Sequence, residues 1–256
     1  MLFRSQTNNL QSRRIIDTRV DATSYADATA RILAWARAGE SRTLVAANVH
    51  VVMEAHDDAQ CRQAINSADL ITPDGMPLVW TLRRRGFPGQ PRVYGPDLTL
   101  HVCEAAAREG IPVGLYGGTP EALAGLQEAY RSRFPQLRVV YAYSPPFRSL
   151  TSAEDEAVAR EIRESGARIV LVGLGCPKQE LWVAEHRGRV PAVMLAVGAA
   201  FDFHSGRVRQ APRWMQRAGL EWLYRLFREP RRLWKRYFKH NPRFVWLVFR
   251  QGKQAG

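Results

Sequence analysis

Short runs of Val, Leu and Ile alternate along most of the chain with longer stretches in which apolar residues recur at helical spacing. This alternation is typical of a parallel sheet covered by helices on both faces. We therefore expect an α/β fold, Rossmann-like, with a mostly parallel sheet. The expected strands are 43–47, 70–72, 113–116, 138–141, 169–172 and 193–197. The expected helices are 51–66, 77–85, 120–134, 152–165 and 178–187.

The longest apolar run, 192–201, has about half of the ~20 residues that a membrane-spanning helix needs. We interpret it as a buried strand. The first residues of the chain contain too short an apolar stretch for a secretory signal. The three cysteines are far apart and form no CxxC pair, so they favour neither a disulfide framework nor a zinc site. We expect a protein of the cytoplasm.

The composition changes after Ala211. Ten aromatic residues lie between Trp214 and Phe249, interleaved with Lys and Arg. From Arg207 onward, fourteen Lys and Arg stand against two Glu, which gives +12 of the net charge of +13. Pro230 and Pro242 are expected to divide this region into three short amphipathic helices, because proline inside a helix removes a backbone donor. We divide the chain into an N-terminal segment (1–42), an α/β core (43–211) and a basic, aromatic-rich helical appendage (212–256).

Two glycine-containing turns follow expected strands, at the sheet edge where open α/β folds bind ligands. In the first, Gly117 and Gly118 precede Thr119, a suitable N-cap residue. Backbone amides at such a helix start suit a pyrophosphate. Turns of this kind are also common in α/β proteins without a phosphate ligand, so both interpretations stay open.

The second turn contains Gly173, Gly175, Lys178 and Gln179. The last two add a charge and a hydrogen-bond donor beside the start of a helix. The third glycine of a dinucleotide fingerprint is replaced by Lys178, and the Walker lysine-serine ending is absent. The turn therefore favours neither a dehydrogenase nor a P-loop NTPase.

Polar residues follow the first two expected strands of the core. Asp74 lies in a Pro-Asp-Gly turn after the strand at 70–72, and Asn48 follows the strand at 43–47. Pro-Asp-Gly is ordinary turn chemistry, but a carboxylate at a strand end is also suited to act as a general base. The six histidines show no metal-ligand spacing and no Asp-x-Asp pair is present, so we expect neither a metal nor a cofactor.

Several segments together resemble the WecG/TagA/CpsF family of inverting glycosyltransferases. They are AANVHVV, ITPDGMPLVW, RVYGPDL, LYGGTPEAL, VGLGCPKQE, VGAAFDFHSGRVRQAPRWM and LEWLYRLFREPRRLWKRY, in this order over residues 43–240. One position departs from the pattern, since Ala46 stands where members often have threonine.

The resemblance implies roles for individual residues. Asp74 would be the base that deprotonates the acceptor hydroxyl, and Asn48, Arg92 and Gln179 would line the same pocket. The appendage would complete the site over the diphosphate groups through the cations Arg225, Arg232 and Lys235.

The resemblance also implies partners. The donor would be a UDP-sugar, with a hexosyl or N-acetylhexosaminyl group transferred without a metal. The acceptor would be a polyprenyl-diphosphate-linked saccharide used for bacterial surface or extracellular polysaccharide. Apolar contact with an anionic membrane, at the inner face of the plasma membrane, would come from Trp234, Phe238 and Trp246.

Two other functions remain open. Aromatics interleaved with basic residues also suit nucleic-acid binding, although the core itself is nearly neutral and no nucleic-acid partner is expected. The second is a soluble enzyme that modifies a sugar nucleotide. The sequence gives no indication of oligomeric state.

Overall fold

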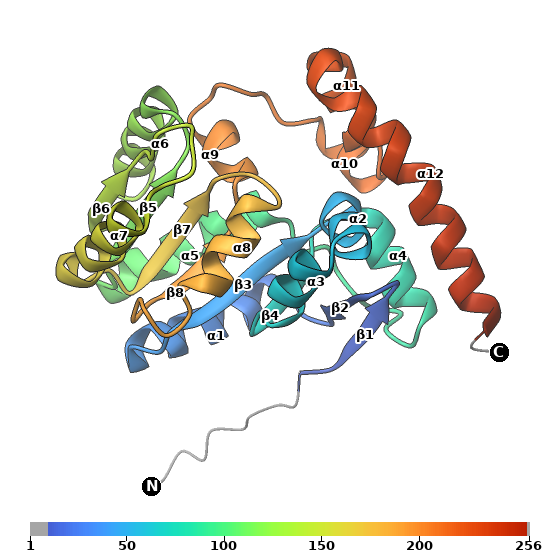
Figure 1. Cartoon of the computed structure of the whole chain (residues 1–256), viewed down its shortest axis with the longest axis horizontal. Coiled ribbons are helices and arrows are strands. Elements are labelled where there is room, and N and C mark those ends of the chain that lie inside the picture. The colour runs from blue at the N-terminus through green and yellow to red at the C-terminus, as the bar shows by residue number, and fades with distance from the viewer. Residues whose placement is uncertain (1–9, 255–256) are drawn as a thin grey trace, which may run out of the picture.

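The computed structural model describes residues 10–254, and a six-stranded parallel sheet lies at its centre (Figure 1). The strand order is β4-β3-β8-β7-β5-β6. The strands are β3 (Arg42–Ala47), β4 (Leu70–Pro73), β5 (Val113–Gly117), β6 (Val139–Tyr143), β7 (Ile169–Gly173) and β8 (Val193–Ala196). The predicted α/β class and the parallel sheet are confirmed.

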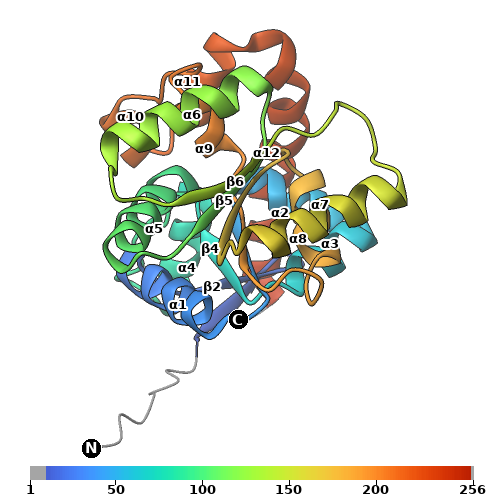
Figure 2. The ribbon, with the colours of Figure 1, turned by 90° about the vertical axis from the view of Figure 1, so that its left-hand side faces the viewer.

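Helices cover both faces of the sheet (Figure 2). One face carries α1 (Tyr25–Ala38), α5 (Gly95–Glu109), α6 (Pro120–Arg133) and α9 (Ala199–His204). The other carries α2 (Val49–Asp57), α3 (Ala59–Asn66), α4 (Met76–Arg84), α7 (Ser152–Ser165) and α8 (Lys178–Glu185). Because strand side chains alternate between faces, Leu44 and Ala46 pack into one core cluster and Val45 and Ala47 into the other.

The N-terminal residues that the structure describes pack onto the core. An antiparallel pair, β1 (Ser12–Ile15) and β2 (Thr18–Asp21), precedes α1. Ile15 and Val20 are fully buried, and the Asp21 carboxylate accepts a hydrogen bond of 2.7 Å from the backbone N–H of Ile71. Residues 10–42 therefore share the core of the sheet.

Two expected elements are wrong in their extent. The helix expected at 51–66 is two helices, because Asp58 adopts an extended backbone and caps α3 by accepting a hydrogen bond from Cys61 N. The run 192–201 is a buried strand only over β8. Its second half turns at Gly198 and begins α9.

The appendage consists of α10 (Arg213–Arg217), α11 (Glu221–Arg228) and α12 (Pro230–Gln254). The expected break at Pro242 is wrong, since α12 continues through it. A proline inside a helix costs about 3 kcal/mol. Burial of Leu233, Tyr237 and Phe244 against the body, at about 1.5–3 kcal/mol for each large apolar side chain, offsets that cost. Pro230 starts the helix, where proline is well tolerated.

Over residues 10–254, none of the helices combines the length and the apolar character needed to cross a bilayer.

Candidate active site

Two cavities meet at the carboxyl ends of the strands. The strand-end cavity, about 1210 Å³, lies beyond β3, β5, β7 and β8 under the 144–151 loop. The appendage cavity, about 900 Å³, lies between the α2–α4 side of the body and helices α11 and α12. The residues that line both are Asn48, Asp74, Ala199, Arg225 and Arg236.

Asp74 is buried at this junction, with 8% of its surface exposed. Arg92 donates to its backbone carbonyl and also places Nη2 3.4 Å from its Oδ1, and the backbone N–H of Gly95 donates to its carboxylate. Burial raises the pKa of Asp74 to about 7; Arg92 opposes this rise and the negative charge of Glu221 adds to it. A carboxyl with such a pKa can accept a proton near neutral pH.

Glu221, in the first turn of α11, connects the appendage to Asp74. Its Oε2 accepts a hydrogen bond of 2.7 Å from Arg92, and its Oε1 accepts one of 2.7 Å from the Tyr94 hydroxyl. The Arg92 guanidinium also lies 4.0 Å from the centre of the Tyr94 ring. Sequence reasoning missed Glu221. The sequence feature that could have indicated it is that Glu221 is one of only two acidic residues in a strongly basic region.

Asn48 lies beside Asp74 because β3 and β4 are neighbours in the sheet. It is the N-cap residue of α2, and its Oδ1 accepts hydrogen bonds from His50 N (3.0 Å) and Val51 N (3.3 Å). A Cβ atom on Gly75 would lie 3.3 Å from the Cα of Asn48, so the Pro-Asp-Gly turn packs tightly on it. The structure brings Asn48 and Asp74 together as expected.

The first glycine turn contributes Gly118 and Thr119 to the strand-end cavity. Thr119 caps α6 by accepting a hydrogen bond of 3.2 Å from Ala122 N. Gly117 lies outside the lining; it has a φ of 119°, and a Cβ there would come within 2.5 Å of the Gly173 backbone. Gly117 therefore permits the close approach of the ends of β5 and β7.

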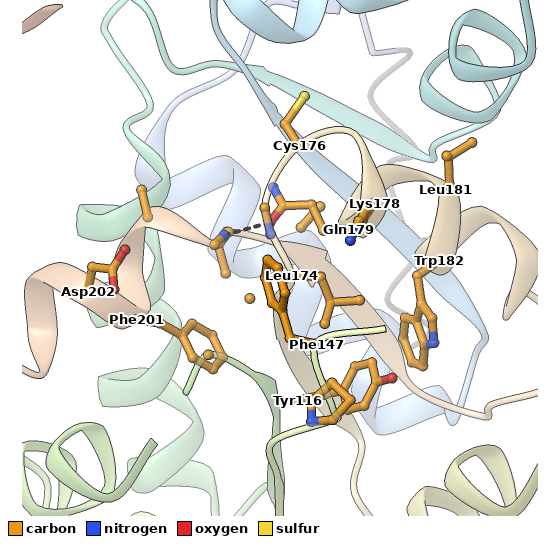
Figure 3. A pocket seen from close by; sticks show the side chains of 18 of the residues that line it. Tyr116, Phe147, Leu174, Cys176, Lys178, Gln179, Leu181, Trp182, Phe201 and Asp202 are labelled. Atoms are coloured by element: carbon orange, nitrogen blue, oxygen red, sulfur yellow. Dashed lines mark hydrogen bonds between the residues drawn. The ribbon is translucent and has the colours of Figure 1, made fainter. Parts of the chain in front are cut away.

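In the second turn, Gly173, Gly175, Lys178 and Gln179 all line the strand-end cavity (Figure 3). Gln179 Oε1 accepts hydrogen bonds of 3.1 Å from the backbone N–H groups of Gly175 and Gly198. Its Nε2 donates to Glu180 Oε1 at 2.9 Å. Gln179 thus joins the loops after β7 and β8 and positions the cavity wall.

An exposed aromatic ring lies over the same cavity. Phe147, in the 144–151 loop, is fully exposed, and the Lys178 ammonium lies 5.2 Å from the centre of its ring. Figure 3 shows Tyr116 and Trp182 farther along the cavity wall. Sequence reasoning did not single out these aromatic residues.

Arg92 and the predicted cations of the appendage differ in which cavity they line. Arg92 lines the appendage cavity, whereas Arg225 lines both cavities, with its guanidinium 5.6 Å from the centre of the Phe203 ring. Lys235 lines neither and lies 5.7 Å from the centre of the Trp234 ring. The side chain of Arg232 lies outside the described residues. Arg236, which sequence reasoning missed, lines both cavities.

The outward face of the appendage is aromatic and exposed. Trp234, Phe238 and Trp246 are exposed by 48%, 70% and 57%, and Trp246 also lines the appendage cavity. Trp214 and Phe227 add 65% and 79% exposed surface on α10 and α11. These aromatic side chains lie among Arg and Lys side chains of the same helices.

A parallel sheet with helices on both faces and a cavity beyond its strand ends is the architecture in which open α/β proteins bind their ligands. Residues 13–256 match the model of the family described as "Glycosyl transferase WecG/TagA/CpsF family". The chain belongs to this family and is a glycosyltransferase. The family acts in cell-surface polysaccharide synthesis, with a sugar nucleotide as donor and a lipid-linked acceptor.

Proposed function

We propose that this protein is an inverting glycosyltransferase that moves a hexosyl or N-acetylhexosaminyl group from a UDP-sugar to a polyprenyl-diphosphate-linked saccharide. The donor occupies the strand-end cavity and the acceptor enters through the appendage cavity. The reaction takes place at the cytoplasmic face of the plasma membrane, in the synthesis of bacterial surface or extracellular polysaccharide.

The position of Asp74 carries this proposal. Among the described residues, Asp74 is the carboxyl group that lines both cavities, so it lies at the boundary between the proposed donor and acceptor spaces. Its raised pKa, about 7, suits a general base. Asp74 takes the acceptor hydroxyl proton while that oxygen bonds to the anomeric carbon. The bond to the nucleoside diphosphate breaks on the opposite face and its electrons leave with the phosphate.

Negative charge then grows on the departing diphosphate, and fixed positive groups stabilise it. The strand-end cavity provides the start of α6 at Thr119, together with the side chains of Lys178, Arg207 and Arg225. Arginine remains charged at all working pH values and can donate two hydrogen bonds to a phosphate. These groups support a transfer that proceeds without a metal ion at the diphosphate.

The appendage supports the choice of a lipid-linked acceptor. The appendage cavity is lined largely by apolar and aromatic side chains, including Trp80, Trp222 and Phe249. The exposed aromatics of α10–α12 are suited to the headgroup layer, and each well-placed cation contributes on the order of 1 kcal/mol of attraction to anionic lipid. Membrane binding would then bring the acceptor to the cavity beside Asp74.

The test is transfer by the purified full chain, followed as nucleotide release with a panel of UDP-sugars in the presence and absence of a lipid-diphosphate acceptor. We expect release only when both substrates are present, and a product of inverted configuration. Release without acceptor would favour a sugar-nucleotide-modifying enzyme. Binding of single-stranded nucleic acid without any release would favour the nucleic-acid alternative.

Asp74→Asn should lower kcat by about 100-fold or more and leave donor binding nearly unchanged, because a general base acts in the chemical step. Asp155→Asn is the matched control, since Asp155 lines the strand-end cavity but not the appendage cavity. Near-normal turnover by Asp74→Asn would exclude Asp74 as the base.

A further inference from the structure

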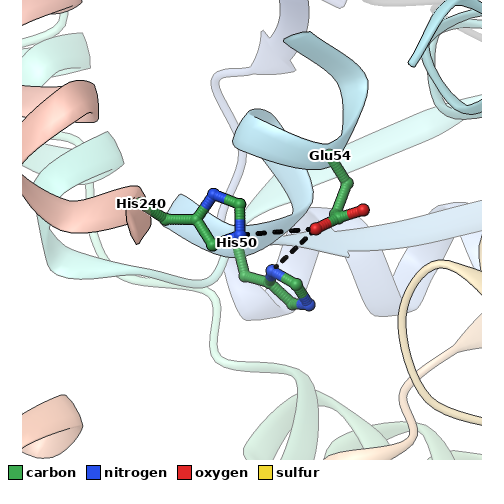
Figure 4. Close-up of side chains that lie close together, drawn as sticks. All are labelled: His50, Glu54 and His240. Atoms are coloured by element: carbon green, nitrogen blue, oxygen red, sulfur yellow. Dashed lines mark ion pairs between the residues drawn. The ribbon is translucent and has the colours of Figure 1, made fainter. Parts of the chain in front are cut away.

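Three side chains of types that can bind a metal ion lie together where α12 packs on α2, apart from the residues assigned to the transfer chemistry above (Figure 4). His50 and Glu54 are one turn apart on α2, and His240 reaches them from α12. We call His50, Glu54 and His240 the α2–α12 cluster. Sequence reasoning could not find it, because His240 is far from α2 along the chain.

The donor atoms are spaced for a shared ion and too far apart for hydrogen bonds. Glu54 Oε1 lies 3.5 Å from His50 Nδ1 and 3.4 Å from His240 Nε2. Good N–H···O hydrogen bonds measure about 2.7–3.2 Å, whereas two ligand atoms on a tetrahedral zinc ion lie about 3.3 Å apart. All three donor atoms lie within 4.8 Å of one another, so the remaining pair needs only a small side-chain rotation.

The two imidazoles are buried without the hydrogen bonds that buried polar atoms normally make. Only 13% of the His50 side chain and 5% of the His240 side chain are exposed. His50 Nδ1, which faces Glu54, is buried and has no hydrogen-bond partner among residues 10–254. Most buried polar groups are satisfied, so this atom indicates a missing partner at this site. The buried, unpaired Nδ1 of His240 lies on the opposite side of its ring from Nε2, which faces Glu54.

Charges around the cluster act in both directions. The positive charges of Arg236 and Lys239 lie near His50 and oppose a metal ion. Asp57 partly offsets them, because its carboxylate pairs with Lys239 at 2.9 Å and with Arg243 at 2.6 Å.

We propose that His50, Glu54 and His240 bind one divalent transition-metal ion, best matched by Zn²⁺, that joins α12 to α2. Two imidazoles and one carboxylate are a ligand set that zinc uses in proteins, and they leave a fourth position for water. The ion holds the appendage against the body. The ion lies near the candidate active site, because His50 is two residues from Asn48 and both imidazoles line the appendage cavity. It takes no part in the proton transfer assigned to Asp74.

The experiment uses the untagged full chain, stripped with a chelator and then titrated with ZnCl₂ by calorimetry. Co²⁺ is the spectroscopic probe, because its visible absorption reports tetrahedral nitrogen and oxygen ligands. We expect one ion per chain. At free zinc about 100 times the Kd, Tm should rise by roughly 5 °C or more, since an ion that binds only the folded state stabilises it.

Variants assign the ion to the cluster. Glu54→Gln and His240→Ala should each weaken zinc binding by about 100-fold or more and remove the Tm increase, because each removes a direct ligand. His56→Ala is the matched control: His56 is also on α2 but pairs with Asp17 at 2.6 Å. The proposal is overturned if the stripped chain binds no zinc, or if both cluster variants bind it as tightly as His56→Ala does.

Discussion

Replacing Glu221 by glutamine should shift the pH dependence of turnover toward lower pH. Arg92 Nη2 lies 3.4 Å from the Asp74 carboxylate and 2.7 Å from the Glu221 carboxylate, so the two carboxylate oxygens are at most about 6 Å apart. Glu221 is one of the causes that raise the pKa of Asp74 to about 7. Glutamine keeps the shape and removes the charge, so ionised Asp74 is stabilised and its pKa falls.

Coulomb's law gives the size of the effect. Two unit charges about 6 Å apart repel by about 2.8 kcal/mol at an effective dielectric constant of about 20, equivalent to about 2 pH units. Doubling the dielectric constant, to allow for the solvent that reaches this junction, halves the value. We therefore expect the pKa of Asp74 to fall by roughly 1–2 units in Glu221→Gln.

The assay is the pH profile of kcat/KM, which reports the pKa values of essential groups in the free enzyme. Activity of the wild type should rise with pH through an apparent pKa of about 7 as Asp74 loses its proton. The rising limb of Glu221→Gln should lie about 1–2 units lower, with a reduced plateau because the base is weaker. Glu229→Gln removes a charge from the other end of α11 and should leave the limb in place. If the rising limb of the Glu221→Gln profile stays at the wild-type pH or moves to higher pH, the electrostatic coupling between Glu221 and Asp74 is refuted.

Three further results are expected. Burial raises the pKa of Glu180 to about 7, so the folded chain keeps a proton that the unfolded chain loses near pH 4.5, and stability falls as pH rises across this window. The free energy of unfolding of Glu180→Gln, measured with denaturant, should therefore exceed that of the wild type by about 3 kcal/mol at pH 8 and by little at pH 4. Turnover of a soluble acceptor analogue should not depend on added Mg²⁺ or Mn²⁺, because arginine and lysine side chains are proposed to stabilise the diphosphate; a zinc-loaded chain that turns over only after either ion is added would contradict this. The double variant Trp234→Ser, Phe238→Ser should bind anionic vesicles about tenfold or more weakly in a sedimentation assay and should turn over the soluble analogue normally. Arg225→Ala should bind vesicles normally and turn over the soluble analogue more slowly.

Much of the fold could be predicted because its strands are continuous apolar runs. β5, β7 and β8 are buried along most of their length, and their Val, Leu and Ile residues have no polar alternation to confuse the assignment. α5 was missed. α5 begins at Gly95 with Pro96 in its first turn, and these residue types are also typical of turns. The buried side of the helix is recognised only from its packing against α1 and the sheet.

The core of the site was predictable for a topological reason. Asn48 and Asp74 follow strands that are neighbours in the sheet, and parallel strands bring their carboxyl ends to one edge. The contributions of α11 and α12 were not predictable, because Glu221, Arg236 and His240 reach their partners through packing between distant segments. Gln179 lies at the predicted place, but its side chain bridges two loops, which no local pattern indicates.

The two faces of α12 determine how the proposed membrane contact would be connected to the candidate active site. Its inward residues Leu233, Tyr237 and Phe244 are buried, and Phe244 belongs to the same core cluster as Val51 and Met53 of α2. Gln251 also accepts a hydrogen bond of 3.0 Å from the backbone of Ile16. Because α12 packs on the body through these residues and contacts α11, the proposed membrane contact on its outward face would lie close to the element that carries Glu221. Removing the whole appendage would expose core residues of α2, so only substitutions on the outward face separate lipid contact from folding.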